Sequence, residues 1–323
     1  MRTLARTFKL LALSLAMTSG LAHAQSYPNR PVKIVVPFAA GGPADNYARF
    51  MAQRLSDELK QSFVIDNKPG AGSIIGTDFA AKSPADGYTL LMMSNAHTVN
   101  ESLIPNKPFG LMKDFVGIAP VNYSNLLLVV HPSVPVKNVG ELIALAKSKP
   151  GKLNYASSGN GTPYHMAGEL FKHMAGINMT HIPYKGSSGA RTDIVGGQVD
   201  VMFDAETTMA VMAREGKVRA LASTGLTRSA NLPDMPTVSE SGVPKFEATI
   251  WLGLMAPKGT PTEIVNRLNA EVRKIVNHPE VKATWARQGA VPMSMTVPEF
   301  EQYLNADIAK WANIVKVSGA KPD

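Results

Sequence analysis

The feature that most constrains the fold is a repeated alternation of short apolar, β-branched segments with longer segments of helical spacing. The strand-like segments are residues 33–38, 63–66, 88–93, 126–130, 153–156, 179–182, 199–203, 218–223 and 249–255. Apolar residues at helical spacing follow the first of them, as in Tyr47, Met51 and Leu55. This alternation is typical of parallel sheets flanked by helices, so we expect an α/β fold.

The length of 323 residues favours two domains over a single core. The alternation of strand-like and helix-like segments begins again at residues 126–130. The last part of the chain has helical patterns at 261–276, 279–287 and 297–317. We therefore predict a discontinuous domain 1 of residues 25–124 plus 250–323, and a domain 2 of residues 125–249. Two crossovers between domains form a natural hinge, and ligand sites favour the cleft beside one.

The N-terminus has the form of a secretory signal peptide. Arg2, Arg6 and Lys9 precede a short apolar run at residues 10–16, and Ala22-His23-Ala24 resembles a signal-peptidase site. We predict that residues 1–24 are removed and that the mature protein is periplasmic. No later segment is apolar for long enough to span a membrane, and the absence of cysteine leaves stability to the core.

The charge pattern argues against nucleic-acid binding. The net charge of +8 falls to +5 in the mature chain, where 30 basic residues face 25 acidic ones. These charges are interspersed, without a basic block or interleaved aromatic residues. A mild positive excess favours small anionic ligands in general.

Five polar or glycine-rich loops follow predicted strands, at residues 37–45, 67–73, 94–97, 157–162 and 182–190. Open α/β sheets bind ligands at the carboxyl ends of their strands, so these loops are the predicted binding site. The predicted ligand-binding residues are Phe38, Ala40, Gly41, Gly42, Asp45, Gly72, Ser73, Ser94, Asn95, Ser157, Ser158, Gly161, Thr162, His165, Tyr184, Lys185, Gly186 and Asp204.

The fourth loop carries the strongest signal for an anion. Thr162 is a good N-cap and Pro163 suits the first helical turn, so a helix begins here. A helix N-terminus has unpaired N–H donors and a partial positive charge, which together suit a carboxylate without a metal or an arginine. Gly41, Gly42 and Gly72 would leave room for the ligand beside the backbone.

Four predicted site residues keep two interpretations each. Asp45 either faces the helix dipole or faces the cleft, where it would favour a ligand ammonium group. Ser73 is either an N-cap or a ligand contact. Lys185 either attracts a distal carboxylate or is solvated, and Asp204 either closes the site or ends its strand.

Six motifs together resemble a known family. They are PFAAGGPAD at 37–45, NKPGAG at 67–72, ADGYTLL at 85–91, SSGNGTPYHMAGELF at 157–171, IPYKG at 182–186 and GGQVDVMFD at 196–204. The chain resembles the periplasmic solute receptors of tripartite tricarboxylate transporters, the Bug family. The local departures are Ser73, where glycine usually continues, and Ser188-Gly189, where a small residue and proline are usual. Both bear on the identity of the ligand.

The resemblance implies a two-domain, type II periplasmic-binding-protein fold with a hinge of two crossovers. The two domains would close around a small carboxylate-bearing organic anion, which backbone amides and ordered water from both domains would hold. It further implies transient delivery to transporter membrane subunits, with no cofactor and no catalysis.

Other functional classes fit less well. His165, Glu169 and His173 share a helix face, but the outer pair would be about 12 Å apart, too far for one metal ion. A hydrolase lacks its Gly-x-Ser-x-Gly elbow, although Ser157-Ser158 precedes a helix. A periplasmic ligand sensor acting with a membrane signalling partner is the main alternative. The sequence leaves open which carboxylate is bound, whether it carries an amine or a second carboxylate, and the oligomeric state.

Overall fold

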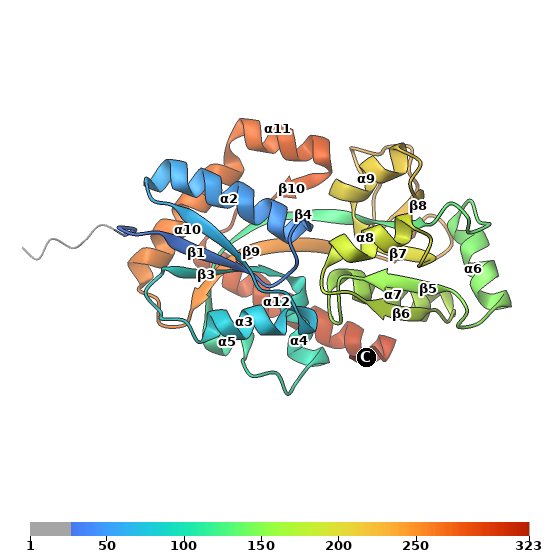
Figure 1. The fold of residues 1–323 in the computed structure, drawn as a ribbon, viewed down its shortest axis with the longest axis horizontal. Helices are drawn as coiled ribbons and strands as arrows, with labels where there is room; N and C mark the ends of the chain where they lie inside the picture. Colours follow the sequence, from blue (N-terminus) through green and yellow to red (C-terminus); the bar gives the residue numbers. More distant parts are fainter. Residues whose placement is uncertain (1–26, 323) are drawn as a thin grey trace, which may run out of the picture.

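Two long antiparallel strands organise residues 27–322, the part of the chain that this computed structural model describes. Strands β4 (Phe115–Val130) and β9 (Thr249–Pro257) run lengthwise through the centre of the molecule (Figure 1). Up to Asn125, β4 pairs with β9; from Leu126 onward it pairs with β7 and β8 instead. The predicted signal peptide, residues 1–24, lies outside the described residues.

The remaining elements lie on either side of this partner change (Figure 1). Before β4 come β1 (Val32–Val36), α2 (Pro43–Leu59), β2 (Phe63–Asn67), the 3-10 turn η2 (Ala71–Ser73), α3 (Ile74–Ala81), β3 (Thr89–Ser94), α4 (Asn95–Leu103) and α5 (Leu111–Asp114). Between β4 and β9 come α6 (Val139–Ser148), β5 (Asn154–Ser157), α7 (Pro163–Ala175), β6 (Thr180–Pro183), α8 (Ser187–Val195), β7 (Val201–Ala205), α9 (Glu206–Arg214) and β8 (Arg219–Ser223). After β9 come α10 (Thr262–Asn277), α11 (Pro279–Gln288), β10 (Ala290–Pro292) and α12 (Val297–Ser318).

The strand order is β2-β1-β3-β9-β4-β7-β5-β6, with β8 and β10 also pairing with β4. Strands β1, β2 and β3 pair in parallel, as do β5, β6 and β7. The central strands are antiparallel, because the chain leaves the first lobe along β4 and returns along β9. The sheet is therefore mixed, rather than parallel throughout as the alternation of elements alone predicts.

Helices cover both faces of the sheet in the lobe that holds β1, β2 and β3. Ile34 and Val36 face a core that includes residues of α2 and α10, while Val35 faces a second core with Phe300 and Leu304 of α12. Burial on both faces explains why these strands read as continuous apolar runs. In the other lobe, Leu127 and Val129 share a core with residues of α8 and α9.

Two parts of the fold differ from the sequence prediction. Residues 94–97 were expected to form a loop, but Ser94 caps α4, and every residue from Asn95 to Asn100 is buried. Six of the nine residues of α4 are polar although most of them are buried, so the segment has the composition of a polar loop. The first half of β4 was also missed; it contains Gly117 and Pro120, and its pairing register shifts twice.

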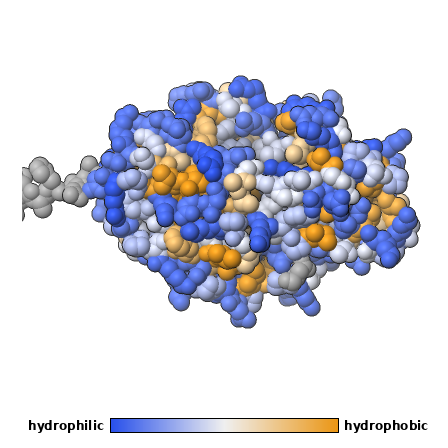
Figure 2. Space-filling view, in the orientation of Figure 1, coloured by the Kyte–Doolittle hydropathy of each residue, from blue (hydrophilic) through white to orange (hydrophobic). Residues whose placement is uncertain are grey.

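Figure 2 shows a face that is mostly hydrophilic, with hydrophobic residues in separate small patches. Among residues 27–322, none of the helices combines the length and the apolar character that crossing a bilayer requires.

Candidate functional site

Four helices begin at one pocket between the two lobes. Pro43, Pro163 and Ser187 are the first residues of α2, α7 and α8, and Ser94 is the N-cap of α4. The pocket has a free space of about 320 Å³, part of which is open to solvent. It is lined by Phe38, Ala39, Gly42, Pro43, Ala44, Ser94, Ser158, Pro163, Tyr164, Ser187 and Ile250.

The chemistry of this lining suits an anion. Each helix N-terminus presents N–H groups without an intrahelical acceptor and about half a unit of positive charge. None of the residues lining the pocket is charged. Attraction for an anion would therefore come from oriented backbone dipoles and from the hydroxyls of Ser94, Ser158, Tyr164 and Ser187.

The pocket has two walls, which touch each other. The first wall comprises Phe38, Ala39, Gly42, Pro43, Ala44 and Ser94; the second comprises Ser158, Pro163, Tyr164 and Ser187. Across the cleft, the Ser188 hydroxyl donates to the Ala40 carbonyl at 2.6 Å and Arg191 Nη1 donates to the Gly41 carbonyl at 3.2 Å. These contacts give the molecule a closed arrangement.

The Asp45 carboxylate holds the loop of the first wall in shape. Its carboxylate accepts hydrogen bonds from the Gly41 N–H at 2.9 Å, from Arg49 Nε at 3.0 Å and from Asn67 Nδ2 at 2.9 Å. Burial alone would raise the pKa of Asp45, but the hydrogen bonds from Arg49, Gly41 and Asn67 outweigh it and lower that pKa. Asp45 is 2% exposed and is not among the lining residues, so its carboxylate fixes the loop shape.

A buried histidine supports the start of α4. The Ser94 hydroxyl accepts from the Ala96 N–H, while the Ser94 N–H donates to His97 Nδ1 at 3.1 Å. The other ring nitrogen of His97 contacts the Thr77 hydroxyl at 2.9 Å. Burial lowers the pKa of His97 to about 4, so the ring is neutral at pH 7. Asn95 bonds the Thr249 carbonyl and lies outside the pocket lining.

The second predicted loop contacts the opposite wall instead of lining the pocket. Gly72 lies so close to Asn160 that an added Cβ would come within 2.2 Å of the Asn160 carbonyl oxygen. Ser73 occupies the N-cap position of α3 in a left-handed conformation, with φ at 83°, and its side chain makes no capping bond. Its buried hydroxyl has no hydrogen-bond partner among residues 27–322.

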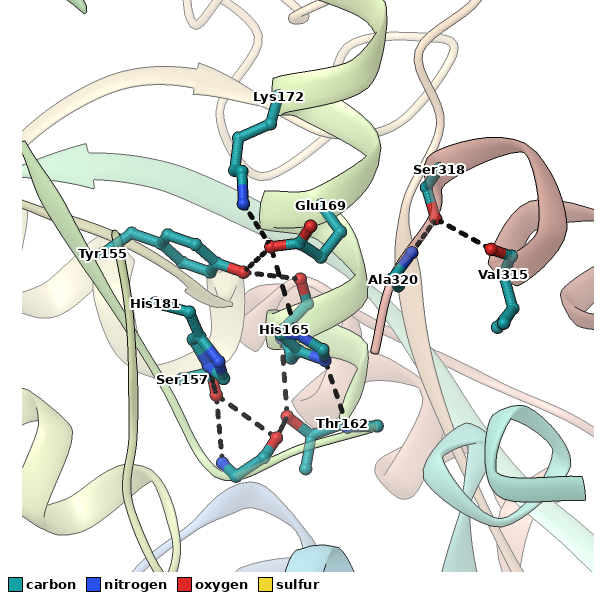
Figure 3. A network of polar contacts seen from close by, with 12 residues as sticks. Tyr155, Ser157, Thr162, His165, Glu169, Lys172, His181, Val315, Ser318 and Ala320 are labelled. Carbon is teal, nitrogen blue, oxygen red and sulfur yellow. Dashed lines mark hydrogen bonds and ion pairs between the residues drawn. The ribbon is translucent and has the colours of Figure 1, made fainter. Parts of the chain in front are cut away.

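A polar network lies behind the second wall (Figure 3). Ser157 Oγ contacts His181 Nε2 at 2.6 Å, and the His181 ring stacks on His165 with centroids 4.2 Å apart. The Tyr155 hydroxyl donates to Glu169 at 2.5 Å, and Lys172 donates to the same carboxylate oxygen at 2.7 Å. The predicted site residues Ser157 and His165 thus belong to this network and do not line the pocket.

The loop from Ser157 to Thr162 uses much of its own backbone. The Gly159 N–H donates to Ser157 Oγ, the Gly161 N–H to His165 Nδ1, and the Thr162 N–H to the Gly159 carbonyl. Thr162 caps α7 as predicted, because its hydroxyl accepts from the His165 N–H. These three N–H groups therefore hold the loop shape, and among the residues of this loop it is Ser158 that lines the pocket.

The fifth loop reaches the pocket through a residue that the sequence did not single out. Tyr184 donates to Asp193, and Lys185 is exposed. Gly186 lies against the first wall, where an added Cβ would come within 2.8 Å of the Ala39 Cβ. Ser187, the first residue of α8, is the member of this segment that lines the pocket.

Tyr164 and a buried ion pair are the main features that sequence reasoning missed. Asp204 is fully buried and accepts from Arg191 Nε at 2.6 Å, although an arginine was not expected here. The Tyr164 hydroxyl lies beside Ser187 and Asp204, yet it forms no hydrogen bond within the described part of the chain. Burial and then Asp204 raise the pKa of Tyr164, so its hydroxyl stays protonated.

Some of these omissions had a sequence signal and others had none. Pro43 and Tyr164 directly adjoin residues of the quoted motifs that were selected, so a wider reading of those motifs would include them. Arg191 and Ile250 had no such signal, because their position follows from how α8 packs and where β9 begins. Of the predicted residues, Phe38, Gly42, Ser94 and Ser158 line the pocket.

Comparisons with known proteins identify the family of this chain. Residues 47–320 match the tripartite tricarboxylate transporter family receptor. Protein BugT of Bordetella pertussis is 39% identical over 311 residues, covering 94% of this chain and 95% of BugT.

Solved structures extend the likeness to the whole fold. A Rhodopseudomonas palustris protein with adipate has a TM-score of 0.89 and 36% identity, covering 92% of this chain and 100% of that chain. MatC from Rhodopseudomonas palustris with bound malate has a TM-score of 0.85 and 32% identity, covering 90% and 100%. The expected α/β solute-binding fold is confirmed, and the chain belongs to the family of tripartite tricarboxylate transporter receptors.

Proposed function

We propose that this protein is a periplasmic receptor that captures a small organic carboxylate and presents it to the membrane subunits of a tripartite transporter. The observation that carries the proposal is the convergence of four helix N-termini on a pocket without a charged lining residue. Such termini bind anions through backbone N–H groups and dipoles. A carboxylate can accept hydrogen bonds from the N–H groups, and its negative charge is attracted by the dipoles.

Two further facts support a carboxylate. Relatives of similar fold were solved with adipate and with malate, which are both dicarboxylates. The signal-peptide pattern of residues 1–24 supports export to the periplasm.

We propose that the ligand is bound without catalysis. Ser157 and His181 are in hydrogen-bond contact, which invites comparison with a hydrolytic serine. Ser157 is fully buried, however, and it does not line the pocket. The pair therefore supports the loop and offers no nucleophile to a bound ligand.

Closure around the ligand would use the central strands as the hinge. We place one domain boundary where β4 changes partners between Asn125 and Leu126, and the other at the start of β9. The two domains are then residues 25–124 plus 250–323, and residues 125–249. A ligand that contacts both walls binds the closed form better and shifts the population towards it.

The test is a thermal-shift screen of unfolded and refolded mature protein against adipate, malate, glutamate, citrate and benzoate, each beside its amide. Refolding removes any ligand retained through purification. A carboxylate at a thousandfold excess over its Kd should add about 4 kcal/mol of stability, while its amide adds much less. Equal shifts with acid and amide, or no shift with any acid, would overturn the carboxylate proposal.

A further inference from the structure

Arg191 reaches across the cleft from the second wall to the backbone of the first. Its guanidinium is held by Asp204 through Nε at 2.6 Å, and its Nη1 donates to the Gly41 carbonyl at 3.2 Å. The Arg191 side chain is 8% exposed and that of Asp204 is fully buried. The contact therefore joins a rigid, charge-paired group on α8 to the loop that opens α2.

The acceptor of this hydrogen bond belongs to a peptide unit at the pocket. The Gly41 carbonyl and the Gly42 N–H share one planar trans peptide, so they point in opposite directions. Gly42 is the N-cap of α2 and lines the pocket. A donor on the carbonyl side fixes the orientation of the peptide and increases the polarity of its N–H, because hydrogen bonds in series polarise one another.

We propose that Arg191 is a positioning residue for the ligand carboxylate, which orients and polarises the Gly42 N–H through the Gly41 carbonyl. This inference rests on the proposed function. Because Arg191 and Gly42 lie on opposite walls, the donor acquires its final geometry only when the cleft closes. Affinity for the carboxylate is thereby coupled to closure without a cation touching the ligand.

Asp204 is what makes this arrangement possible in a buried place. An arginine charge removed from water needs a partner, and the Asp204 carboxylate raises the pKa of Arg191 against the lowering effect of burial. Asp204 also accepts from the Ala205 N–H at 2.7 Å, which anchors it to the end of β7. The ion pair is therefore fixed in direction and adds little net charge to the pocket.

The neighbouring contact of Ser188 provides a matched control. Its hydroxyl also crosses the cleft, but it donates to the Ala40 carbonyl. The N–H of that peptide belongs to Gly41 and already donates to Asp45. Ser188→Ala therefore removes a cross-cleft hydrogen bond without affecting the Gly42 N–H.

The experiment compares full-length mature protein with three variants: Arg191→Met/Asp204→Asn, Arg191→Lys and Ser188→Ala. The double variant removes both charges together, so neither is left buried alone. Lysine keeps the charge but lacks the planar fork that serves Asp204 and Gly41 together. The probe is the acid among adipate, malate, glutamate, citrate and benzoate that binds wild type most tightly, with its amide as a second probe.

We expect the double variant and Arg191→Lys to lose at least tenfold in affinity for the acid, with less than threefold loss for the amide. Ser188→Ala should lose less than threefold for either. A general structural defect would weaken acid and amide alike. Retention of wild-type affinity for the acid by the double variant would overturn the positioning role, whereas failure of wild type to bind any acid would overturn the proposed function.

A second readout examines the Gly42 amide directly, in wild type and double variant that are both saturated with the acid so that the cleft is closed. In protein labelled with ¹⁵N-glycine, the Gly42 amide proton should shift upfield in the double variant because its polarisation is lost. The amide of Gly176, which ends α7, should not move. A Gly42 resonance that is the same in the acid-saturated double variant as in acid-saturated wild type would overturn the inference.

Discussion

The two walls of the pocket present similar backbone donors but are supported in different ways. In the first wall, Asp45 bonds Gly41 four residues before it, and His97 bonds Ser94 three residues before it. In the second wall, Ser157 depends on His181, which lies 24 residues later, and Arg191 depends on Asp204, 13 residues later.

In both walls the side chains that hold the loops in shape, such as Asp45, His97 and Arg191, are not among the residues that line the pocket. Both walls also use partners from other elements, but their ion pairs differ in burial: Arg49 beside Asp45 in the first wall is half exposed, whereas Arg191 and Asp204 in the second are both buried. We therefore expect the second wall to be the more sensitive to loss of one charged partner.

The largest effect is expected where the walls meet. Gly72→Ala would place a Cβ 2.2 Å from the Asn160 carbonyl oxygen, so the two walls could not approach as they do here. If the closed form fell to about 1% of the population, the apparent affinity would fall about 100-fold. Calorimetric titration with the best-binding acid measures the loss, and small-angle scattering measures the opening.

The control for this prediction is Gly176→Ala. Gly176 has a φ of 61°, close to the 59° of Gly72, but an added Cβ there meets no atom within 4 Å. The Gly176→Ala variant should therefore have similar backbone strain but bind the acid as tightly as wild type does. A Gly72→Ala protein that binds as tightly as wild type would mean that the walls do not need this contact.

The next effect is acid sensitivity from the first wall. Burial lowers the pKa of His97 to about 4, below its ordinary value of 6.5. The folded state favours the neutral ring. The stability that His97 contributes is therefore fully present above about pH 6.5 and is lost as the pH falls towards 4. The free energy of unfolding, measured with urea, should be about 2 kcal/mol lower at pH 5 than at pH 7 because of His97.

Two histidine variants test whether His97 in the first wall causes this pH dependence. His97→Gln should reduce the difference between pH 7 and pH 5, whereas His173→Gln, at an exposed site, should not. If the full difference persisted in His97→Gln, His97 would not be its source.

A smaller effect is expected at the cap of α7. The Thr162 hydroxyl donates to the Gly159 carbonyl at 2.7 Å and accepts from the His165 N–H. Thr162→Ala should lower the free energy of unfolding by about 1 kcal/mol, because an N-cap is lost. Thr192→Ala, an exposed helical position, should change it by less than about 0.5 kcal/mol in chemical denaturation. Equal losses would mean that the cap made by Thr162 contributes no more to stability than the exposed Thr192 does.

The smallest effect is expected at Lys185, which the sequence selected but which is exposed and outside the pocket lining. Lys185→Ala should weaken binding of the acid by less than about twofold at physiological salt, because exposed charges are screened. A loss above tenfold in calorimetric titration would show that Lys185 turns into the cleft when ligand is present.

Sequence reasoning succeeded where the determining forces are local. The helix at Pro163 follows from its N-cap and the spacing of Met166, Leu170 and Phe171, and it begins where predicted. It failed at α4, because most residues of this buried helix are polar, and in the first half of β4, where Pro120 and shifts in register obscure the strand.

The sequence by itself determined the alternation of strands and helices, the family, and four of the five predicted loop segments that contribute residues to the pocket lining. Only the tertiary structure decided which residues of those loops face the pocket. A loop residue faces inward or outward according to contacts made by elements far away in the chain. Arg191 illustrates this, because Asp204 holds its guanidinium and the Gly41 carbonyl of the opposite wall accepts a hydrogen bond from it.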